Sequence, residues 1–271
     1  MHPVFEKRFF VLGIVNVTPD SFFDGGKYAT TAQAVEHGLS LVGDGADLLD
    51  IGGESTRPGA MLLGVEEEMA RVVPVVSALS KRTSIPLCVD TTKAIVAQAA
   101  IDAGATWIND ISAGRFDPKM PLVISKNQCH VILMHSRHTP QSMQKAPMYD
   151  DVIADVSKEL LCSVDQFRFA GVAREKIVID PGIGFAKRAE DNMAILSKCD
   201  EFSALGFPVC IGASRKSFIG FFTQREAAGR LAGSLACVAA AFYKGARYFR
   251  VHDVKETVDM LKMLEAVKYH G

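Results

Sequence analysis

Short apolar runs alternate along the chain with segments in which apolar residues recur every three or four positions. Eight such runs occur, each ending on small or polar residues, over residues 11–16, 46–54, 85–90, 105–110, 129–135, 176–182, 208–214 and 246–252. Short continuous apolar runs bounded by turn residues are typical of buried strands. The intervening segments have the spacing of amphipathic helices, over residues 30–43, 66–81, 92–103, 151–170, 189–205, 225–244 and 254–269, with a short helix expected before residue 127.

This alternation predicts an α/β protein with a parallel sheet, because parallel strands need long crossover connections and, when buried, read as continuous apolar runs. Dividing 271 residues by eight units gives about 34 residues per unit, close to the repeat of a TIM barrel. We therefore expect residues 1–271 to form a single (β/α)8 TIM barrel, with active-site loops at the carboxyl ends of the strands. A doubly wound open sheet is the alternative, but the chain has neither a G-x-G-x-x-G turn after its first strand nor a Walker A loop.

Composition and charge exclude several classes of partner. Hydrophobic residues make up 48% of the chain and the formal net charge is −1, so no overall basic field favours nucleic acid or an anionic membrane. The six cysteines form no C-x-x-C pair, which favours reduced thiols. The first ten residues, MHPVFEKRFF, lack the apolar region of a signal peptide. We therefore expect a cytoplasmic protein.

Polar side chains follow every predicted strand, on the face where TIM-barrel active sites lie. They comprise amides, carboxylates and cations: Asn16, Glu54, Asp90, Asn109, Asp110, His135, Asp180, Ser214, Arg250 and His252. Any one of them alone is explained most simply as a helix cap or turn residue. Capping does not readily explain the whole ring, so we expect closure of the barrel to gather these residues into one site.

Two neighbouring segments have the character of an anion site. The segment SRKSF (214–218) opens a predicted helix, where backbone N–H groups, Arg215, Lys216 and Ser217 would suit a bound anion. On the next strand, Arg250 and His252 would grip and donate to phosphate oxygens.

Three further strand ends carry Asp90, Asn109 and Asp180, which would form the floor of a pocket. Their hydrogen-bonding groups suit a flat polar heterocycle with amino and lactam edges. For a metal, Asn16 with phosphate oxygens and water would suit Mg²⁺, which takes few protein ligands. Zinc is less favoured, because His130 and His135 are an odd number of residues apart on one strand and face opposite sides.

These residues lie in long motifs that resemble the dihydropteroate synthase family. The resemblance covers nearly the whole chain and rests on GIVNVTPDSFFDGG (13–26), DIGGESTRPGA (50–60), VDTTK (89–93), INDISAG (108–114), LMHSR (133–137), DPGIGF (180–185), GASRKSFIG (212–220) and RVHDV (250–254). It implies a TIM-barrel transferase, usually a homodimer, that uses Mg²⁺ and is inhibited by sulfonamides. The implied reaction joins a dihydropterin-methyl diphosphate to 4-aminobenzoate and releases pyrophosphate, by ionisation of the pterin C–O bond followed by amine attack.

The resemblance also implies roles for individual residues. It implies that Asn16 contacts Mg²⁺ and diphosphate, that Arg250 and His252 bind diphosphate, and that Phe185 and Ser217 bind 4-aminobenzoate. The implied pterin pocket comprises Asp90, Asn109, Asp180 and Lys216. The implied loops that close over the substrates contain Asp20, Asp24, Thr56, Arg57 and Pro58. The implied catalytic residues are Asp20, Asp24, Arg57 and Lys216.

Two positions depart from the family pattern near the expected pocket. Ser136 stands where many members have a larger residue, and Ala186 replaces a frequent glycine. Two other functions remain open at this point: a pterin-dependent methyltransferase that serves a corrinoid, and a non-catalytic pterin-binding protein. The anion site and the STRPG segment argue against the first, and the set of Asn16, Arg250 and His252 argues against the second.

Overall fold

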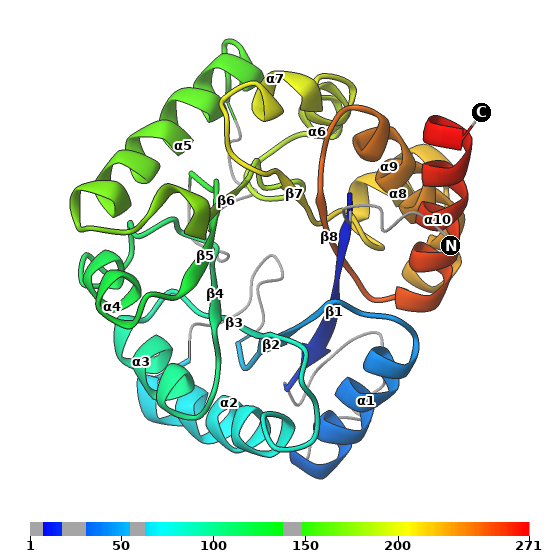
Figure 1. Ribbon diagram of the computed structural model, residues 1–271. Helices are drawn as coiled ribbons and strands as arrows, with labels where there is room; N and C mark the ends of the chain where they lie inside the picture. Colours follow the sequence, from blue (N-terminus) through cyan, green and yellow to red (C-terminus); the bar gives the residue numbers. More distant parts are fainter. Residues whose placement is uncertain (1–7, 18–30, 55–62, 138–147, 271) are drawn as a thin grey trace.

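Eight parallel strands form a closed ring with the helices outside it (Figure 1). The computed structural model describes residues 8–17, 31–54, 63–137 and 148–270. The strands are β1 (Phe10–Asn16), β2 (Leu48–Gly52), β3 (Leu87–Asp90), β4 (Trp107–Asp110), β5 (His130–Met134), β6 (Ile177–Asp180), β7 (Cys210–Ile211) and β8 (Tyr248–Val251). Their order is β6-β5-β4-β3-β2-β1-β8-β7, and a parallel bridge between Ile179 and Val209 joins the two ends. The TIM-barrel prediction is confirmed, and the open-sheet alternative is wrong.

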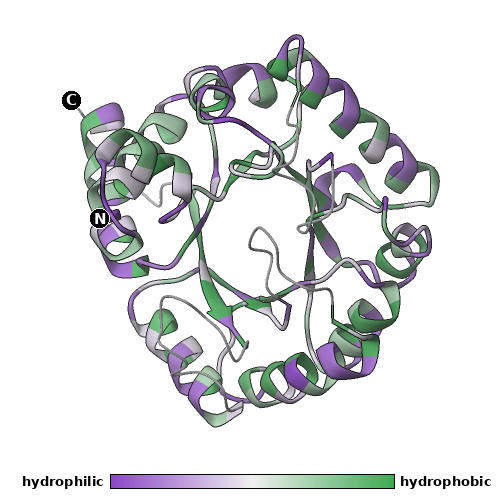
Figure 2. Ribbon diagram, turned by 180° about the vertical axis from the view of Figure 1, so that it is seen from behind, coloured by the Kyte–Doolittle hydropathy of each residue, from purple (hydrophilic) through white to green (hydrophobic). Residues whose placement is uncertain are grey.

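Helices follow the strands in the order that the periodicity predicts. They are α1 (Thr31–Gly43), α2 (Val65–Leu79), α3 (Ala94–Asp102), α4 (Met120–Asn127), α5 (Val152–Phe169), α6 (Ala189–Ser197), α7 (Cys199–Ser203), α8 (Ser217–Thr223), α9 (Leu231–Tyr243) and α10 (Val254–His270). Hydrophilic residues are interspersed with hydrophobic ones along this outer ring (Figure 2). Among the described residues, no helix combines the length and the apolar character needed to cross a membrane.

Two helices differ from the sequence prediction. The helix expected over residues 189–205 is divided at Lys198, whose backbone is not helical (φ −116°, ψ 27°). The helix expected over residues 225–244 begins only at Leu231, after a 3-10 turn over Ala227–Gly229. The Arg230 side chain explains this start, because it donates to the carbonyl oxygens of Arg225 at 2.8 Å and Arg215 at 3.1 Å.

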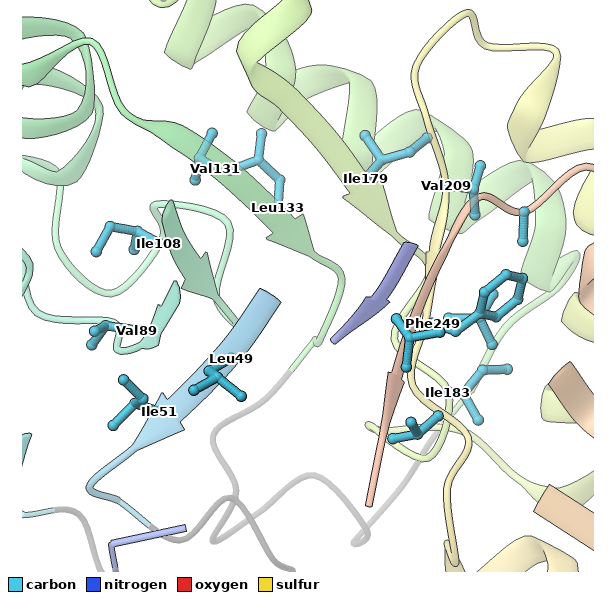
Figure 3. Packing of buried hydrophobic residues seen from close by; sticks show 14 of the residues in the cluster. Leu49, Ile51, Val89, Ile108, Val131, Leu133, Ile179, Ile183, Val209 and Phe249 are labelled. Carbon is cyan, nitrogen blue, oxygen red and sulfur yellow. The ribbon is translucent and has the colours of Figure 1, made fainter. Parts of the chain in front are cut away.

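The outward faces of the strands carry buried aliphatic and aromatic side chains that pack beneath the helices. Figure 3 shows this set, which includes Leu49, Ile51, Val89, Ile108, Val131, Leu133, Ile179, Val209 and Phe249. Burying such side chains stabilises the fold by roughly 1.5–3 kcal/mol each before conformational entropy is counted. Because successive residues of a strand point to opposite faces, the residues between them point into the barrel.

The barrel interior begins with an apolar layer near the amino ends of the strands. This layer consists of Leu12, Leu48, Cys88, Trp107, Ile132, Val178 and Cys210, with Phe10 and Tyr248 packed against it. The His130 ring stacks on Trp107 with 4.4 Å between centroids. The layer closes one end of the barrel, so a site in its interior opens only toward the carboxyl ends of the strands.

Candidate active site

A polar layer lies directly above the apolar layer, two residues further along the same strands. Moving two positions from the apolar residues of β2, β3, β4, β6 and β8 gives Asp50, Asp90, Asn109, Asp180 and Arg250. Asp50, Asp90, Asn109 and Asp180 are all buried. The period of two residues thus sets this whole group on the inner face. The prediction that the pocket residues Asp90, Asn109, Asp180 and Arg250 come together is consistent with this arrangement.

Arg250 lies at the centre of the polar layer and binds two carboxylates. Its Nε donates to Oδ2 of Asp50 at 2.5 Å and its terminal nitrogen donates to Oδ2 of Asp90 at 2.9 Å. The amide of Asn109 donates to the same oxygen of Asp50 at a longer 3.5 Å. Gly212 lies alongside, where an added Cβ would be in ordinary contact with Cβ of Arg250 at 3.7 Å.

Asp50 is the site residue that sequence reasoning missed. It is fully buried within β2, and its Oδ1 has no hydrogen-bond partner among the described residues. In the sequence it stands inside an apolar run rather than at its end, so a search of strand ends passes over it. The signal that would find it is a charge two residues after the inward-facing Leu48.

Burial dominates the protonation of the pocket floor. It raises the pKa of Asp90 to about 8, with the Arg250 guanidinium acting in the opposite direction. It also raises the pKa of Asp180, opposed by Lys216 and by the Gly182 N–H, which donates to Oδ1 of Asp180 at 2.7 Å. Desolvation favours the neutral form of each acid, and the cations restore the charged form. A cation near the floor therefore favours the ionised form of these acids, which accepts hydrogen bonds.

Lys216 reaches the polar layer from the turn before α8. Its Nζ donates to the carbonyl oxygen of Ile183 and lies 4.6 Å from the centroid of the Phe185 ring. Burial lowers the pKa of Lys216 to about 8, with Asp180 opposing the shift and Arg250 adding to it. Ser217 is exposed at the first position of α8. Lys216 thus connects the Asp180 floor to the aromatic side of the pocket.

His252 is held by Ser214, whose Oγ lies 3.0 Å from Nδ1 of the ring and accepts from the backbone N–H of His252 at 3.3 Å. The expected anion site loses one contributor, because Arg215 forms an ion pair with both oxygens of Asp253, including Nε to Oδ2 at 2.8 Å. Of the cationic and histidine residues expected at the anion site, Lys216, Arg250 and His252 therefore remain as candidates.

Asn16, the residue expected to bind the metal, lies at the end of β1. Asn16 is half-buried and lies opposite Gly52, which in turn lies opposite Asp90. Within the described ranges, no group of three or more His, Cys, Asp or Glu side chains could enclose a metal ion. A single amide oxygen fits a cation such as Mg²⁺ that takes its remaining ligands from water and substrate phosphates.

Two of the strand-end residues expected in the site, Asp110 and Glu54, use their carboxylates in other contacts. Asp110 caps a turn, accepting from the Ser112 N–H and the Gly114 N–H at 2.8 Å each, so the capping interpretation holds there. Glu54 forms an ion pair with Lys93 at 2.5 Å. The loop residues Asp20, Asp24, Thr56, Arg57 and Pro58 lie outside the described residues.

Both departures from the family pattern lie close to the pocket. Ser136 is buried and is the second residue after the end of β5. Ala186 belongs to a small buried apolar cluster with Phe185, Ile111 and Met134. Ala186 has a φ of +48°, a conformation that glycine adopts readily and other residues seldom adopt. This backbone geometry explains why glycine is frequent at that position.

Comparison with known proteins agrees with this geometry. Residues 12–252 match the family described as pterin binding enzyme. The dihydropteroate synthase of Bacillus subtilis (strain 168) is 43% identical over 267 residues, covering 98% of this chain and 91% of the relative.

Solved structures give the same result. A crystal structure of Yersinia pestis dihydropteroate synthase with a sulfonamide drug complex has a TM-score of 0.93 at 42% identity, covering 96% of this chain and 94% of that one. Xanthomonas albilineans dihydropteroate synthase with 4-aminobenzoic acid has a TM-score of 0.91 at 47% identity, covering 97% and 94%. The chain therefore belongs to the pterin-binding enzyme family and, within it, to the dihydropteroate synthases.

Proposed function

We propose that this transferase condenses (7,8-dihydropterin-6-yl)methyl diphosphate with 4-aminobenzoate, giving 7,8-dihydropteroate and pyrophosphate in tetrahydrofolate biosynthesis. The observation that carries the proposal is the polar layer, in which buried acids and an amide surround Arg250. Such a layer costs stability unless it serves a ligand, because buried polar groups need partners. We propose that residues 1–271 act as one pterin-binding domain.

The pterin ring is proposed to lie on the floor made by Asp90, Asn109 and Asp180. The Asp180 carboxylate would accept from the amino edge of the pterin, and Lys216 would donate to its polar edge. This assignment is supported by the burial of all three floor residues, which selects a ligand that matches each donor and acceptor.

The diphosphate is proposed to bind Arg250 and His252 at the end of β8. Arg250 is fixed by two carboxylates and His252 by Ser214, so both would meet the leaving group with little rearrangement. Asn16 would hold Mg²⁺ beside them, and the bound cation would neutralise charge on the departing diphosphate.

The chemical step is proposed to be ionisation of the pterin C–O bond, followed by attack of the aminobenzoate nitrogen. Arg250 and His252 would stabilise the leaving pyrophosphate, while the floor carboxylates would stabilise the positive charge that develops on the pterin. Phe185 and Ser217 would receive 4-aminobenzoate, which the Xanthomonas relative was solved with. The amine is itself the nucleophile, and the acidic ammonium formed with the C–N bond loses its proton to water or to the released pyrophosphate, so the site needs no strong general base.

The loop residues Asp20, Asp24, Thr56, Arg57 and Pro58 are proposed to cover the substrates, with Asp20, Asp24 and Arg57 acting with Lys216 in catalysis. Excluding water would protect the cationic intermediate from hydrolysis. We further propose inhibition by sulfonamides, a homodimeric assembly and a cytoplasmic location. The sulfonamide complex of the Yersinia relative supports the first of these.

The deciding experiment measures pyrophosphate release from the pterin diphosphate in Mg²⁺, with and without 4-aminobenzoate. We expect release that is coupled to formation of dihydropteroate. Pterin binding without release would contradict the proposal and favour a non-catalytic binding protein. Methyl transfer to a corrinoid would then test the methyltransferase alternative.

A further inference from the structure

Three side chains at the carboxyl end of β5 form a connected series, Lys187, His135 and Glu159. The Lys187 side chain, which is 3% exposed, lies with its Nζ 3.0 Å from Nδ1 of His135. The opposite ring nitrogen of His135, Nε2, lies 2.9 Å from Oε2 of Glu159 on α5. Nothing in the proposed reaction uses this series, although burying an ammonium group is costly unless it is paired.

The geometry assigns the proton positions along this series. Burial lowers the pKa of Lys187 to about 7, with Asp180 opposing the shift. In its ammonium form Lys187 can only donate, so Nδ1 of His135 accepts from it and Nε2 carries the hydrogen that is donated to Glu159. His135 is then neutral and connects the Lys187 amino group to a carboxylate. Burial and Lys187 together lower the pKa of His135 to about 4, and the bond from His135 helps to lower the pKa of Glu159 to about 2, both in agreement with this arrangement.

Lys187 also makes a contact that leads into the active site. Its Nζ donates to the carbonyl oxygen of Phe185 at 3.0 Å, and Phe185 in turn donates its N–H to the carbonyl of Gly182 at 3.1 Å. The turn is tightly enclosed, because a Cβ at Gly182 would lie 1.9 Å from the carbonyl oxygen of His135 and 3.3 Å from Nζ of Lys187.

His135 secures the other end of the same turn through its backbone. Its N–H donates to the carbonyl of Asp180 at 2.9 Å, so one residue of β5's carboxyl end holds Asp180 directly and Phe185 through Lys187. Glu159 is itself held in place, because Arg137 donates to its Oε1 at 2.7 Å and to Asp155 at 2.9 Å. Glu159 is partly open to a cavity of about 190 Å³ that His135 also lines.

We propose that Lys187 is a positioning residue, which with His135 and Glu159 fixes the turn over residues 180–187 and so places the Phe185 ring for 4-aminobenzoate. The inference rests on the proposed function for the role of Phe185. The hydrogen bond of Lys187 is to Phe185, whereas Asp180 is bonded to the His135 backbone and interacts with Lys187 only through charge. The effect of Lys187 should therefore fall on the aminobenzoate side of the pocket.

The test is the substitution Lys187→Met, which keeps an unbranched side chain one atom shorter and removes its donors. We expect the KM for 4-aminobenzoate to rise about 10-fold, while the KM for the pterin diphosphate changes less than about twofold. Lys198→Met is the control, since Lys198 is exposed and paired with Glu201 at 3.5 Å, and it should leave both constants unchanged. Equal changes in the two KM values, or loss of stability alone, would overturn the proposal.

A second variant keeps the proposal testable if Lys187→Met does not fold. Glu159→Gln changes a partly exposed side chain and weakens its bond to His135, so we expect the KM for 4-aminobenzoate to rise about threefold. The double variant should be no worse than Lys187→Met, because both changes act through His135. An unchanged KM for 4-aminobenzoate in Glu159→Gln, or additive effects in the double variant, would contradict the proposal that Lys187, His135 and Glu159 act together.

The wild-type reaction separates the two proposals. If the unmodified protein makes no dihydropteroate from the two substrates, the proposed function fails. If it makes dihydropteroate and the variants keep the wild-type KM for 4-aminobenzoate, only the role of Lys187 fails.

Discussion

The two layers inside the barrel come from the same strands, two residues apart, and differ in almost every physical respect. The lower layer is apolar and close to a protein core in character, as with Val178 on β6. The upper layer places Asp180 on that strand and Arg250 on β8, and burial raises the pKa of Asp90 and of Asp180. We therefore expect substitutions in the apolar layer to lower mainly the stability, and substitutions in the polar layer to lower mainly the activity.

The largest expected effect comes from the upper layer. Lys216→Ala or Asp180→Asn should lower kcat/KM at least about 100-fold, because each removes a group that faces the reacting pterin. The free energy of unfolding should change by less than about 1 kcal/mol, since relieving a buried charge offsets the lost contacts. Steady-state kinetics and urea denaturation measure the two quantities.

Val178→Ala is the matched control two residues below Asp180. It should lower the free energy of unfolding by about 2 kcal/mol through cavity formation and leave the activity of the folded enzyme within about twofold of wild type. If Asp180→Asn and Val178→Ala lose stability and activity in the same proportion, the two layers do not differ in role.

The next largest effect concerns Asp50, which supports Arg250 without facing the opening of the site. Asp50→Asn should lower kcat/KM about 10- to 100-fold, the range expected for losing a hydrogen bond between charged groups. Asp47→Asn tests specificity, because the Asp47 carboxylate accepts from the N–H of Val11 at the opposite end of β1. Equal losses of activity in both variants would show that Asp50 acts only through the fold.

A smaller effect is expected at the metal ligand. Asn16→Ala should raise the Mg²⁺ concentration for half-maximal activity about 10-fold, because the cation would lose its one protein oxygen. Asn127→Ala, which removes an amide bonded to Gln98 and to the Val123 carbonyl, should leave the Mg²⁺ response unchanged. A wild-type Mg²⁺ response in Asn16→Ala would remove Asn16 from the metal site.

The smallest effect is expected at the exposed rim. Ser217→Ala should raise the KM for 4-aminobenzoate about threefold, since an exposed hydroxyl contributes a hydrogen bond that water partly replaces. Ser197→Ala, another exposed serine near a helix end, should not change it. A KM that is unchanged by Ser217→Ala would place the aminobenzoate carboxylate elsewhere.

The fold was largely predictable because a local pattern, an apolar run that ends on a polar residue, indicates each strand. The strand ends also revealed Asp90, Asn109, Asp180 and Arg250, since residues at these ends meet on one face. Asp50 escaped because its role depends on a bond to Arg250, 200 residues away along the chain. No local pattern encodes that pairing.

Other features escaped for related reasons. Lys187 appears in the sequence as a surface lysine, and only the tertiary structure shows that it is buried beside His135. Conversely, Asp110 has the sequence signature of a site residue, yet its carboxylate closes a turn. Sequence reasoning thus locates the end of the barrel that carries the chemistry more readily than it identifies which polar residues there serve the backbone.

The seam of the ring between β6 and β7 has a consequence for hydrogen exchange. Each of the other strand pairs shares a ladder of at least two paired positions, whereas β6 meets the β7 side through the single bridge at Ile179 and Val209. Cooperative opening of a sheet begins where the fewest bonds must break together. The Ile179 amide, which donates across the seam to Pro208 at 3.0 Å, should therefore exchange with solvent deuterium faster than the amides inside β2 and β3. Asp180 is the next residue after Ile179, so the strand pair with the fewest paired positions lies next to the floor of the pocket.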